Sequence, residues 1–489
     1  MQTLETLNLD NTYTRLPELF FERVMPTGFE TSHLVSFNPS AAALIDLDPD
    51  EAKRPEFHQA MGGKLLLPGS EPIAMLYAGH QFGHYVSPLG DGRAILLGEV
   101  RNGRGETWDL HLKGAGLTRF SRDGDGRAVL RSTIREYLCG EAMHGLGIPT
   151  TRSLCLIGSD EAVLRESVET GAMLVRMAPS HVRFGTFEVF FYRRQHDHLK
   201  TLADYVLAGH FPHLVDGPDP YARFLREVAE RTGRLIAQWQ AVGWAHGVMN
   251  TDNMSILGLT LDYGPYGFMD DFNPGFIPNH SDHHGRYSFQ NQPDIGYWNV
   301  RAIAQALSPL VGEADVLGAP EVYEATMQQT YTDLMQAKLG LKEARDGDDK
   351  LRRDLLALMH SHHVDYTNFF RALGSFNQDD PSANEHLRDQ FLDREGFDWW
   401  ADRYRARLKA EHSEDVARKA HMDACNPKYV LRNYLVQVAI ERAARHRDYS
   451  EIDRLRELLC HPFDDQPEMH EYAAPPPDWG KQIVVSCSS

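Results

Sequence analysis

Two side chains near the middle of the chain, Asn253 and Asp262, have the chemistry of a divalent-metal site. Both offer oxygen ligands, which are the ligands that Mg²⁺ and Mn²⁺ prefer. The residues between them, 254–261, are largely apolar, and this spacing fits a short hairpin that presents both side chains to one site. We therefore predict that Asn253 and Asp262 bind the metal, either Mg²⁺ or Mn²⁺.

The residues around this pair indicate that the metal carries a nucleotide. Protein-kinase catalytic loops read H-R-D-x-x-x-x-N and are followed by D-F-G. Here His246 and Asn253 keep that spacing and residues 262–264 read DYG, but Val248 replaces the catalytic Asp and cannot accept a proton. Asp252 is the nearest acid and hence the candidate base, because a base must reach the substrate hydroxyl. The alternative is a loop aspartate that caps a neighbouring residue.

A lysine and a glutamate in the expected order complete a phosphate-binding pattern. Lys113 ends a predicted strand, and Glu136 lies 23 residues later in a predicted helix. In kinase sites a strand lysine contacts the phosphates and pairs with a helix glutamate. The alternative is an edge-strand lysine and a solvated helix glutamate. The order shared with the downstream loop favours the pair.

Glycine-rich segments and two arginines supply further groups for phosphate. The segments 89–93 (LGDGR) and 123–127 (DGDGR) contain glycines, which let backbone N–H groups approach a phosphate closely. Arg176 and Arg183 follow in the β-rich region, and guanidinium groups match phosphate oxygens well. The alternatives are a hairpin turn, a flexible connector, and arginines paired with surface acids.

The composition is that of an ordinary soluble globular protein. Of the 489 residues 42% are hydrophobic and 24% charged, and the formal net charge of −19 argues against nucleic acid or an anionic membrane as the main partner. Residues 1–5 show no secretory signal and no long apolar run exists, so we expect no membrane span. The five cysteines include no C-x-x-C, which argues against a disulfide scaffold or structural zinc and favours a cytoplasmic protein.

Hydrophobic periodicity predicts a β-rich region followed by a helical one. Strands are expected over residues 94–97, 107–113, 162–168 and 172–177, with one helix over 131–144 that stops at Gly145. Short helices are expected over 17–25 and 39–47. Longer helices are expected over 220–241 with Asp219 as the cap, over 321–375 with an interruption at 342–354, and over 401–411 and 428–445. Residues 473–478 read as an extended tail.

This order of elements predicts an α+β, two-lobed protein-kinase-like fold, with a β-rich N-lobe that carries one key helix and a helical C-lobe. The helices beyond residue 320 exceed what a kinase core needs. The predicted parts are an N-terminal extension (1–90), the N-lobe (91–190), the C-lobe with the catalytic and metal loops (191–320), a C-terminal helical region (321–470) and an extended tail (471–489).

Five segments together resemble the selenoprotein O family of protein adenylyltransferases. They are residues 77–83 (YAGHQFG), 89–93 (LGDGR), 112–116 (LKGAG), 246–254 (HGVMNTDNM) and 279–289 (NHSDHHGRYSF). The resemblance covers nearly the whole chain and implies a kinase-like fold that binds ATP in an inverted orientation. It implies transfer of AMP to Ser, Thr or Tyr hydroxyls of proteins with release of pyrophosphate, and it is compatible with self-modification.

Carried onto this sequence, the resemblance implies a role for each candidate residue. Lys113 would hold phosphate and be positioned by Glu136. Asn253 and Asp262 would bind the metal, and Asp252 would accept the proton. The co-substrate ATP would be contacted by Gly90, Gly92, Arg93, Lys113, Asp125, Gly126, Arg176, Arg183 and Asp262. The two arginines would grip the far phosphates.

Cys487 is similar in position to the residue that is selenocysteine in animal members of that family. Some relatives have a second cysteine in the loop near residues 277–279, which could pair with this tail. This chain has Pro278 there and no cysteine between Cys155 and Cys425. A redox latch through that loop is therefore not expected.

Two other functions stay open from the residues alone. One is a conventional phosphotransferase that uses Asp252 as its base, and Val248 argues against it. The other is a non-catalytic nucleotide-binding scaffold, which would have little use for both metal ligands. The sequence names neither the protein substrates nor the nucleotide donor beyond the implied ATP.

Overall fold

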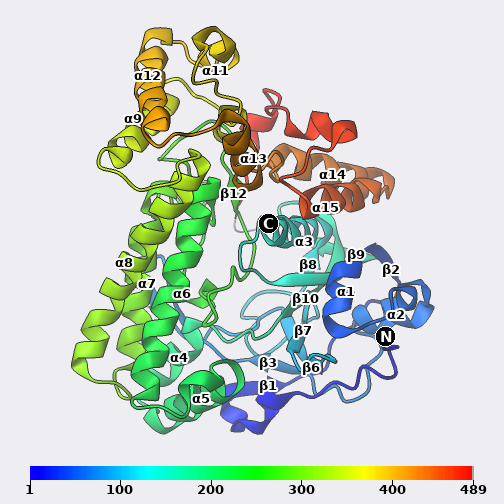
Figure 1. The fold of residues 1–489 in the computed structure, drawn as a ribbon. Helices are drawn as coiled ribbons and strands as arrows, with labels where there is room; N and C mark the ends of the chain where they lie inside the picture. The colour runs from blue at the N-terminus through cyan, green and yellow to red at the C-terminus, as the bar shows by residue number, and fades with distance from the viewer. Residues whose placement is uncertain (487–489) are drawn as a thin grey trace.

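An antiparallel β-sheet forms the centre of the molecule, and the fold is α+β (Figure 1). The computed structural model describes residues 1–486, so Cys487 lies outside the described residues. Within that range the eight-stranded sheet has the order β1 (Phe21–Arg23), β3 (Ile73–Met75), β6 (Ala94–Arg101), β7 (Thr107–Lys113), β10 (Val168–Ala178), β9 (Arg152–Leu164) and β2 (Ser32–Phe37), with β8 (Ala128–Val129) paired to β10. Separate pairs are β4 (Gly79–Gln81) with β5 (His84–Val86), and β11 (Trp244–Ala245) with β12 (Gly267–Phe268).

Helices flank the sheet and form most of the second half of the chain. Those in the first half are α1 (Pro39–Ala42), α2 (Pro55–Met61), α3 (Leu130–Gly145), α4 (Phe184–Tyr192), α5 (His196–His210) and α6 (Pro220–Val242). Those that follow are α7 (Gln292–Leu307), α8 (Glu313–Lys338), α9 (Asp348–Ser361), α10 (Tyr366–Leu373), α11 (Glu385–Arg388), α12 (Arg394–Ala410), α13 (Asp415–Cys425), α14 (Asn433–His446) and α15 (Ser450–Cys460). Helices α6, α7 and α8 pack side by side, away from α1 and α2 (Figure 1). None of the helices within residues 1–486 has both the length and the apolar character needed to cross a bilayer.

The register of the central strands places the candidate polar residues on one face of the sheet. In β7 the side chains alternate, so Leu110 and Leu112 are buried on one face while His111 and Lys113 project from the other. Arg176 of β10 lies directly opposite His111 and therefore projects from the same face as Lys113. The leucine face packs against the N-terminal helices α1 and α2. The polar face is left for α3 and the site.

Helix α3 carries Glu136 to that polar face. The helix expected over residues 131–144 spans Leu130–Gly145. It buries Ile134 and Leu138 in the core beneath the sheet, and Glu136 is 2% exposed. Gly145 is required at the helix end, because a Cβ there would lie 1.9 Å from the carbonyl oxygen of Leu459 in α15.

Three local predictions are wrong. Residues 17–25 form a 3₁₀ turn (Glu18–Phe20) that leads into β1, because backbone pairing of Phe21 with Met75 ties this segment to the sheet edge. Residues 162–168 form no single strand, since β9 ends at Leu164 and β10 begins at Val168. Asp219 does not cap α6 through its side chain, because its backbone is left-handed with φ +48°. The other expected helices and strands are present, most with shifted ends, and the helical region expected over 321–375 is divided into α8, α9 and α10. In the tail that was expected to be extended, Gly480–Gln482 form a 3₁₀ turn.

A second hydrophobic core lies among α8, α9, α10 and α12 and contains a buried cation. Lys338, the last residue of α8, is 5% exposed. Its Nζ lies 4.6 Å from the centroid of the Phe370 ring and 5.4 Å from that of Tyr366. No carboxylate within residues 1–486 forms an ion pair with it, and burial lowers the pKa of Lys338 to about 7. This residue therefore makes stability depend on pH.

Replacing Lys338 with methionine should remove that dependence. The unfolded chain holds this proton up to a pKa of 10.5, whereas the folded chain releases it near pH 7. The unfolded state thus binds more protons between these values, so the wild-type free energy of unfolding rises with pH by up to about 1.4 kcal/mol per unit from this group. We expect Lys338→Met to be more stable than wild type at pH 7, by a margin that shrinks toward pH 10.

Urea denaturation at several pH values from 7 to 10 measures this margin. Lys419→Met, which removes an exposed lysine of α13, serves as the control and should differ little from wild type at every pH. A Lys338→Met margin that stays constant over the whole range would contradict the assignment.

Candidate active site

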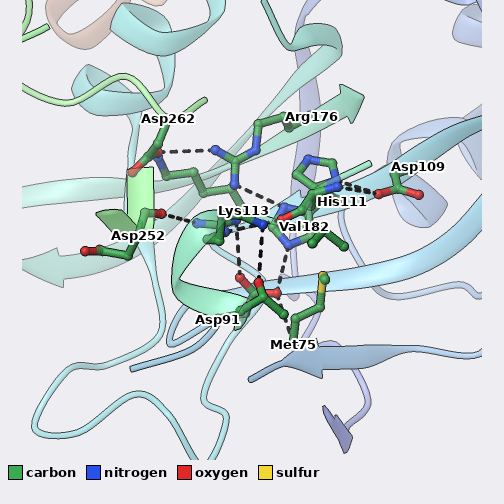
Figure 2. A network of polar contacts seen from close by, with 12 residues as sticks. Met75, Asp91, Asp109, His111, Lys113, Arg176, Val182, Asp252 and Asp262 are labelled. Atoms are coloured by element: carbon green, nitrogen blue, oxygen red, sulfur yellow. Dashed lines mark hydrogen bonds and ion pairs between the residues drawn. The ribbon is translucent and has the colours of Figure 1, made fainter. Parts of the chain in front are cut away.

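Lys113 lies within a cluster of opposite charges drawn from β7, α3, β10 and the loop after residue 253 (Figure 2). Its Nζ donates to a carboxylate oxygen of Glu136 and to Oδ1 of Asp262, the latter at 2.5 Å. Arg176 donates from Nη1 to the same two acids, at 3.1 Å to Glu136 and 3.2 Å to Asp262. Two cations and two carboxylates thus form one connected set. The expected pair of Lys113 and Glu136 is present, and the glutamate is not solvated.

Asp262 is the member of this cluster that faces outward. Its side chain is 32% exposed, compared with 2% for Glu136. The surrounding protein opposes ionisation, but the positive charges of Lys113 and Arg176 outweigh it and hold the pKa of Asp262 well below its ordinary value. Asp262 is therefore a permanent carboxylate that is open on one side, as a metal ligand must be.

Asn253 offers a second oxygen ligand. It lies in the 3₁₀ turn Thr251–Asn253, and its Nδ2 donates to the carbonyl oxygen of Val248 at 3.0 Å. That bond occupies the amide nitrogen and leaves the amide oxygen for a cation. In the described part of the chain, no group of three or more His, Cys, Asp or Glu side chains could hold an ion. Asn253 and Asp262 therefore fit Mg²⁺ or Mn²⁺ only if substrate phosphates and water complete the coordination.

Asp252 is buried but keeps one carboxylate oxygen unused. Its Oδ2 accepts a hydrogen bond from Nε2 of Gln81 at 3.2 Å, while its Oδ1 has no hydrogen-bond partner among residues 1–486. Burial raises the pKa of Asp252 to about 6. A carboxylate with a free oxygen and a raised pKa can take a proton from a hydroxyl brought to it.

Arg183 lies behind Asp252 and is buried, like Arg176. Its Nη1 donates to the backbone oxygen of Asp252 at 3.1 Å, and its guanidinium group stacks over the Tyr77 ring at 4.3 Å. Its Nη2 makes no hydrogen bond within the described residues and lies 4.0 Å from Oδ1 of Asp91. Of the acids near the two arginines, Glu136 and Asp91 are buried and Asp262 is only partly exposed, so the alternative of surface ion pairs is wrong.

Arg176 is also held by His111, which in turn is hydrogen-bonded to Asp91. Arg176 lies between Asp262 and His111 (Figure 2), with its Nη2 3.2 Å from Nδ1 of His111. Nε2 of His111 is 3.1 Å from Asp91, which also accepts from the backbone N–H of Met75 at 3.1 Å. Burial lowers the pKa of His111, so the ring is neutral and accepts at Nδ1 while it donates at Nε2. His111 is not among the site residues predicted from the sequence, although its place in the alternation of β7 puts it on the face of Lys113.

A cavity of about 680 Å³ opens beside the charge cluster. Its lining includes five of the residues expected to contact a nucleotide, namely Gly90, Gly92, Arg93, Asp125 and Gly126. Arg93 also helps to lower the pKa of Asp262, which places the cavity next to the cluster. Tyr77 lines it as well. Gly90 has φ +117°, and a Cβ there would lie 2.5 Å from the Phe120 ring, so only glycine fits this wall.

The hairpin of β4 and β5 supports the Asp252 turn, and sequence reasoning assigned it no role. Besides the bond from Gln81 to Asp252, the backbone N–H of His80 donates to Oγ1 of Thr251 at 2.7 Å. Gly79 passes so close that a Cβ there would lie 2.6 Å from Oδ1 of Asp252. The motif at residues 77–83 was visible in the sequence, but residue types alone do not show which loop it contacts.

Comparisons with known proteins show the family of this chain. The family described as "Protein adenylyltransferase SelO" matches residues 3–459, which include every candidate site residue. A protein of Myxococcus xanthus named protein nucleotidyltransferase YdiU is 62% identical over 489 residues, or 100% of both chains. Proteins of the same name from Thioalkalivibrio sulfidiphilus and Thiobacillus denitrificans are 58% and 56% identical, again over 100% of both chains.

Gly79→Ala should destabilise the site without removing any functional group. The added methyl group must displace the turn that carries Asp252, and such overpacking costs about 1–3 kcal/mol. Gly209→Ala is the matched control, because a Cβ there meets nothing within 4 Å and alanine suits the interior of α5. Chemical denaturation should show a lower free energy of unfolding for Gly79→Ala and an unchanged or higher one for Gly209→Ala. Equal values for both variants would show that the turn can shift freely.

Proposed function

The chain belongs to the SelO family of protein adenylyltransferases, and we propose that it transfers AMP from ATP to Ser, Thr or Tyr hydroxyls of proteins at the site around Lys113 and Asp262. It is an enzyme, a protein nucleotidyltransferase. The observation that carries the proposed mechanism is the group of buried cations, Lys113, Arg176 and Arg183, near Asp252. Asp252 is itself buried and keeps one carboxylate oxygen without a hydrogen-bond partner among residues 1–486. Val248 stands where a kinase would have its base.

We propose that the elements are arranged as the two lobes of a kinase-like fold. Strands β6 to β10 with α3 would be the N-lobe, residues 91–190, and the segment with the catalytic and metal loops would be the C-lobe, residues 191–320. Residues 1–90 would be an extension that adds β1, β2 and β3 to the same sheet, 321–470 a further helical region and 471–489 a tail. The order of strands and helices along the chain, with Glu136 of α3 paired to Lys113 of β7, supports this division.

The placement of positive charge supports an inverted ATP. Lys113, Arg176 and Arg183 are all at least nine-tenths buried, on the inner side of the site. The β- and γ-phosphates carry most of the negative charge of ATP, so we place them against these three side chains. Nη2 of Arg183 has no hydrogen-bond partner among residues 1–486 and can donate to a phosphate oxygen. The α-phosphate would then lie toward the outward-facing Asp262, where an acceptor can reach it.

In the proposed reaction the acceptor hydroxyl oxygen attacks the α-phosphorus. The new O–P bond forms as the bond to the oxygen bridging the α- and β-phosphates breaks, and Asp252 takes the hydroxyl proton. Lys113, Arg176 and Arg183 neutralise the pyrophosphate that leaves. Asn253 and Asp262 would hold a divalent ion, which would supply further neutralisation of charge on the phosphates when bound. The protein contributes alignment and charge rather than covalent chemistry.

Label from the α-phosphate of ATP should become bound to protein, and label from the γ-phosphate should not. The pure protein is incubated with each labelled ATP, with Mg²⁺ and then Mn²⁺, and both self-labelling and labelling of added proteins are followed. Protein-bound γ-label alone would make the chain a conventional phosphotransferase. Binding of ATP without transfer of either label would favour a non-catalytic scaffold.

Asp252→Asn should lower the rate of α-label transfer by about 10²–10⁴-fold while ATP binding persists, because only the proton acceptor is lost. Asp262→Asn should lower both transfer and metal-dependent nucleotide binding. Asp402→Asn, in which a carboxylate that is 74% exposed on α12 is neutralised, should change neither. Full transfer by Asp252→Asn would remove this residue from the mechanism.

Arg183→Ala should weaken ATP binding more than the loss of an ordinary surface arginine. A hydrogen bond to a charged group contributes about 1.5–3 kcal/mol, which corresponds to roughly 10- to 100-fold in affinity. Arg226→Ala is the control, because Arg226 is 69% exposed on α6. Isothermal titration calorimetry with a non-hydrolysable ATP analogue measures both. Equal affinities of the two variants for the ATP analogue would show that the β- and γ-phosphates do not contact Arg183.

A further inference from the structure

A second cavity lies apart from the residues of the candidate active site. Its volume is about 210 Å³, and it is bounded by α6, α8, the end of α13 and the segment that follows α3. Most of its lining is apolar and includes Ile148, Val242 and Leu334. None of the residues assigned to nucleotide, metal or proton transfer lines it.

Lys338 lines this cavity, and its amine, when protonated, has no anionic partner among residues 1–486. It is 5% exposed and forms no ion pair with any acid within residues 1–486. Its Nζ lies over two aromatic faces, those of Phe370 at 4.6 Å and Tyr366 at 5.4 Å. The titratable neighbour is Cys425, which also lines the cavity; burial raises the pKa of its thiol, so this group supplies no negative charge at neutral pH.

An ammonium group buried without an anion costs free energy that methionine at the same place would not. The Lys338 side chain is thus half of an ion pair, and the same residue lines a cavity that can hold the other half.

We propose that this cavity binds a small amphipathic carboxylate, whose carboxylate pairs with Lys338 and whose apolar body lies against Ile148, Val242 and Leu334. An ammonium group has three donors and no acceptor, which suits a carboxylate and excludes a ligand cation. A cavity of about 150 Å³ holds benzene, so about 210 Å³ admits one aromatic ring or a short aliphatic chain with a carboxylate. ATP is too large and too highly charged for this space.

The cavity adjoins backbone that leads into the active site. Ile148 lies two residues before Thr150, whose Oγ1 is hydrogen-bonded to the hydroxyl of Tyr263, the neighbour of Asp262. Val242 ends α6, immediately before the segment that enters β11 and the catalytic loop. A bound carboxylate would therefore lie against both supports of the metal loop, yet the binding site itself does not depend on the proposed AMP transfer.

The test is a comparison of two probes with the same apolar body. Isothermal titration calorimetry is carried out with 3-phenylpropionate and with the neutral 3-phenylpropanol on the full-length protein. We expect the acid to bind wild type at least about tenfold more tightly than the alcohol, because the pair with Lys338 is a charged hydrogen bond. In Lys338→Met the affinity for the acid should fall to that for the alcohol, and the affinity for the alcohol should be the same as in wild type.

Two further variants separate the cavity from general effects on the fold. Ala337→Phe, which places a ring in the cavity wall, should abolish binding of both probes. Lys419→Met, which removes an exposed lysine of α13, should change neither affinity. The proposal is overturned if wild type binds acid and alcohol equally, if it binds neither up to their solubility, or if Lys338→Met keeps the preference for the acid.

Discussion

The contact of Lys113 and Arg176 with Glu136 and Asp262 is the interaction on which the rest of this structure depends. A buried cation is tolerated only when an anion is brought to it with good geometry. The two cations arise from neighbouring strands, β7 and β10, so the two acids must come from elements that cross the polar face of the sheet. Helix α3 supplies one and the loop after the Asn253 turn supplies the other. The position of α3 on the sheet, the register of β7 and the course of the loop that carries Asp262 are all consistent with this pairing of two cations with two carboxylates.

The two acids of this set are not equivalent, because one has a structural role and the other is placed to contact substrate. Glu136 is enclosed and fixes Lys113 and Arg176, whereas Asp262 is partly open and shares the same cations. A nucleotide phosphate can therefore compete for Lys113 and Arg176 at the open side without dismantling the enclosed one. Asp252 and Asn253 are adjacent in the chain but are held by different partners, Gln81 and the backbone of Val248. Each side chain is thus free to serve a different atom of the substrate.

The sequence predicted those parts of the site whose positions are set by local periodicity. The alternation of β7 and the length of α3 were enough to bring Lys113 and Glu136 together, and β10 was predicted well enough to carry Arg176. The support from Gln81 could not be predicted, because it joins residues 171 positions apart. Helix α4 escaped prediction because seven of its nine residues are buried, which leaves little contrast between its faces. Residues 17–25 were mispredicted because pairing at the sheet edge overrode a helical pattern.

The close contact between Gly145 and the backbone of Leu459 has a consequence for control of the site. In many enzymes a helix that carries a critical acid swings in and out, and activity follows its position. Here α3 is held at its C-terminal end by main-chain contact with α15, and Arg135 in its middle donates to the carbonyl oxygen of Tyr266 at 3.1 Å. An outward swing would break packing at both places along with the buried charge set. Helix α3 is therefore held in one position, and Glu136 stays paired with Lys113 and Arg176 without a movement of the helix.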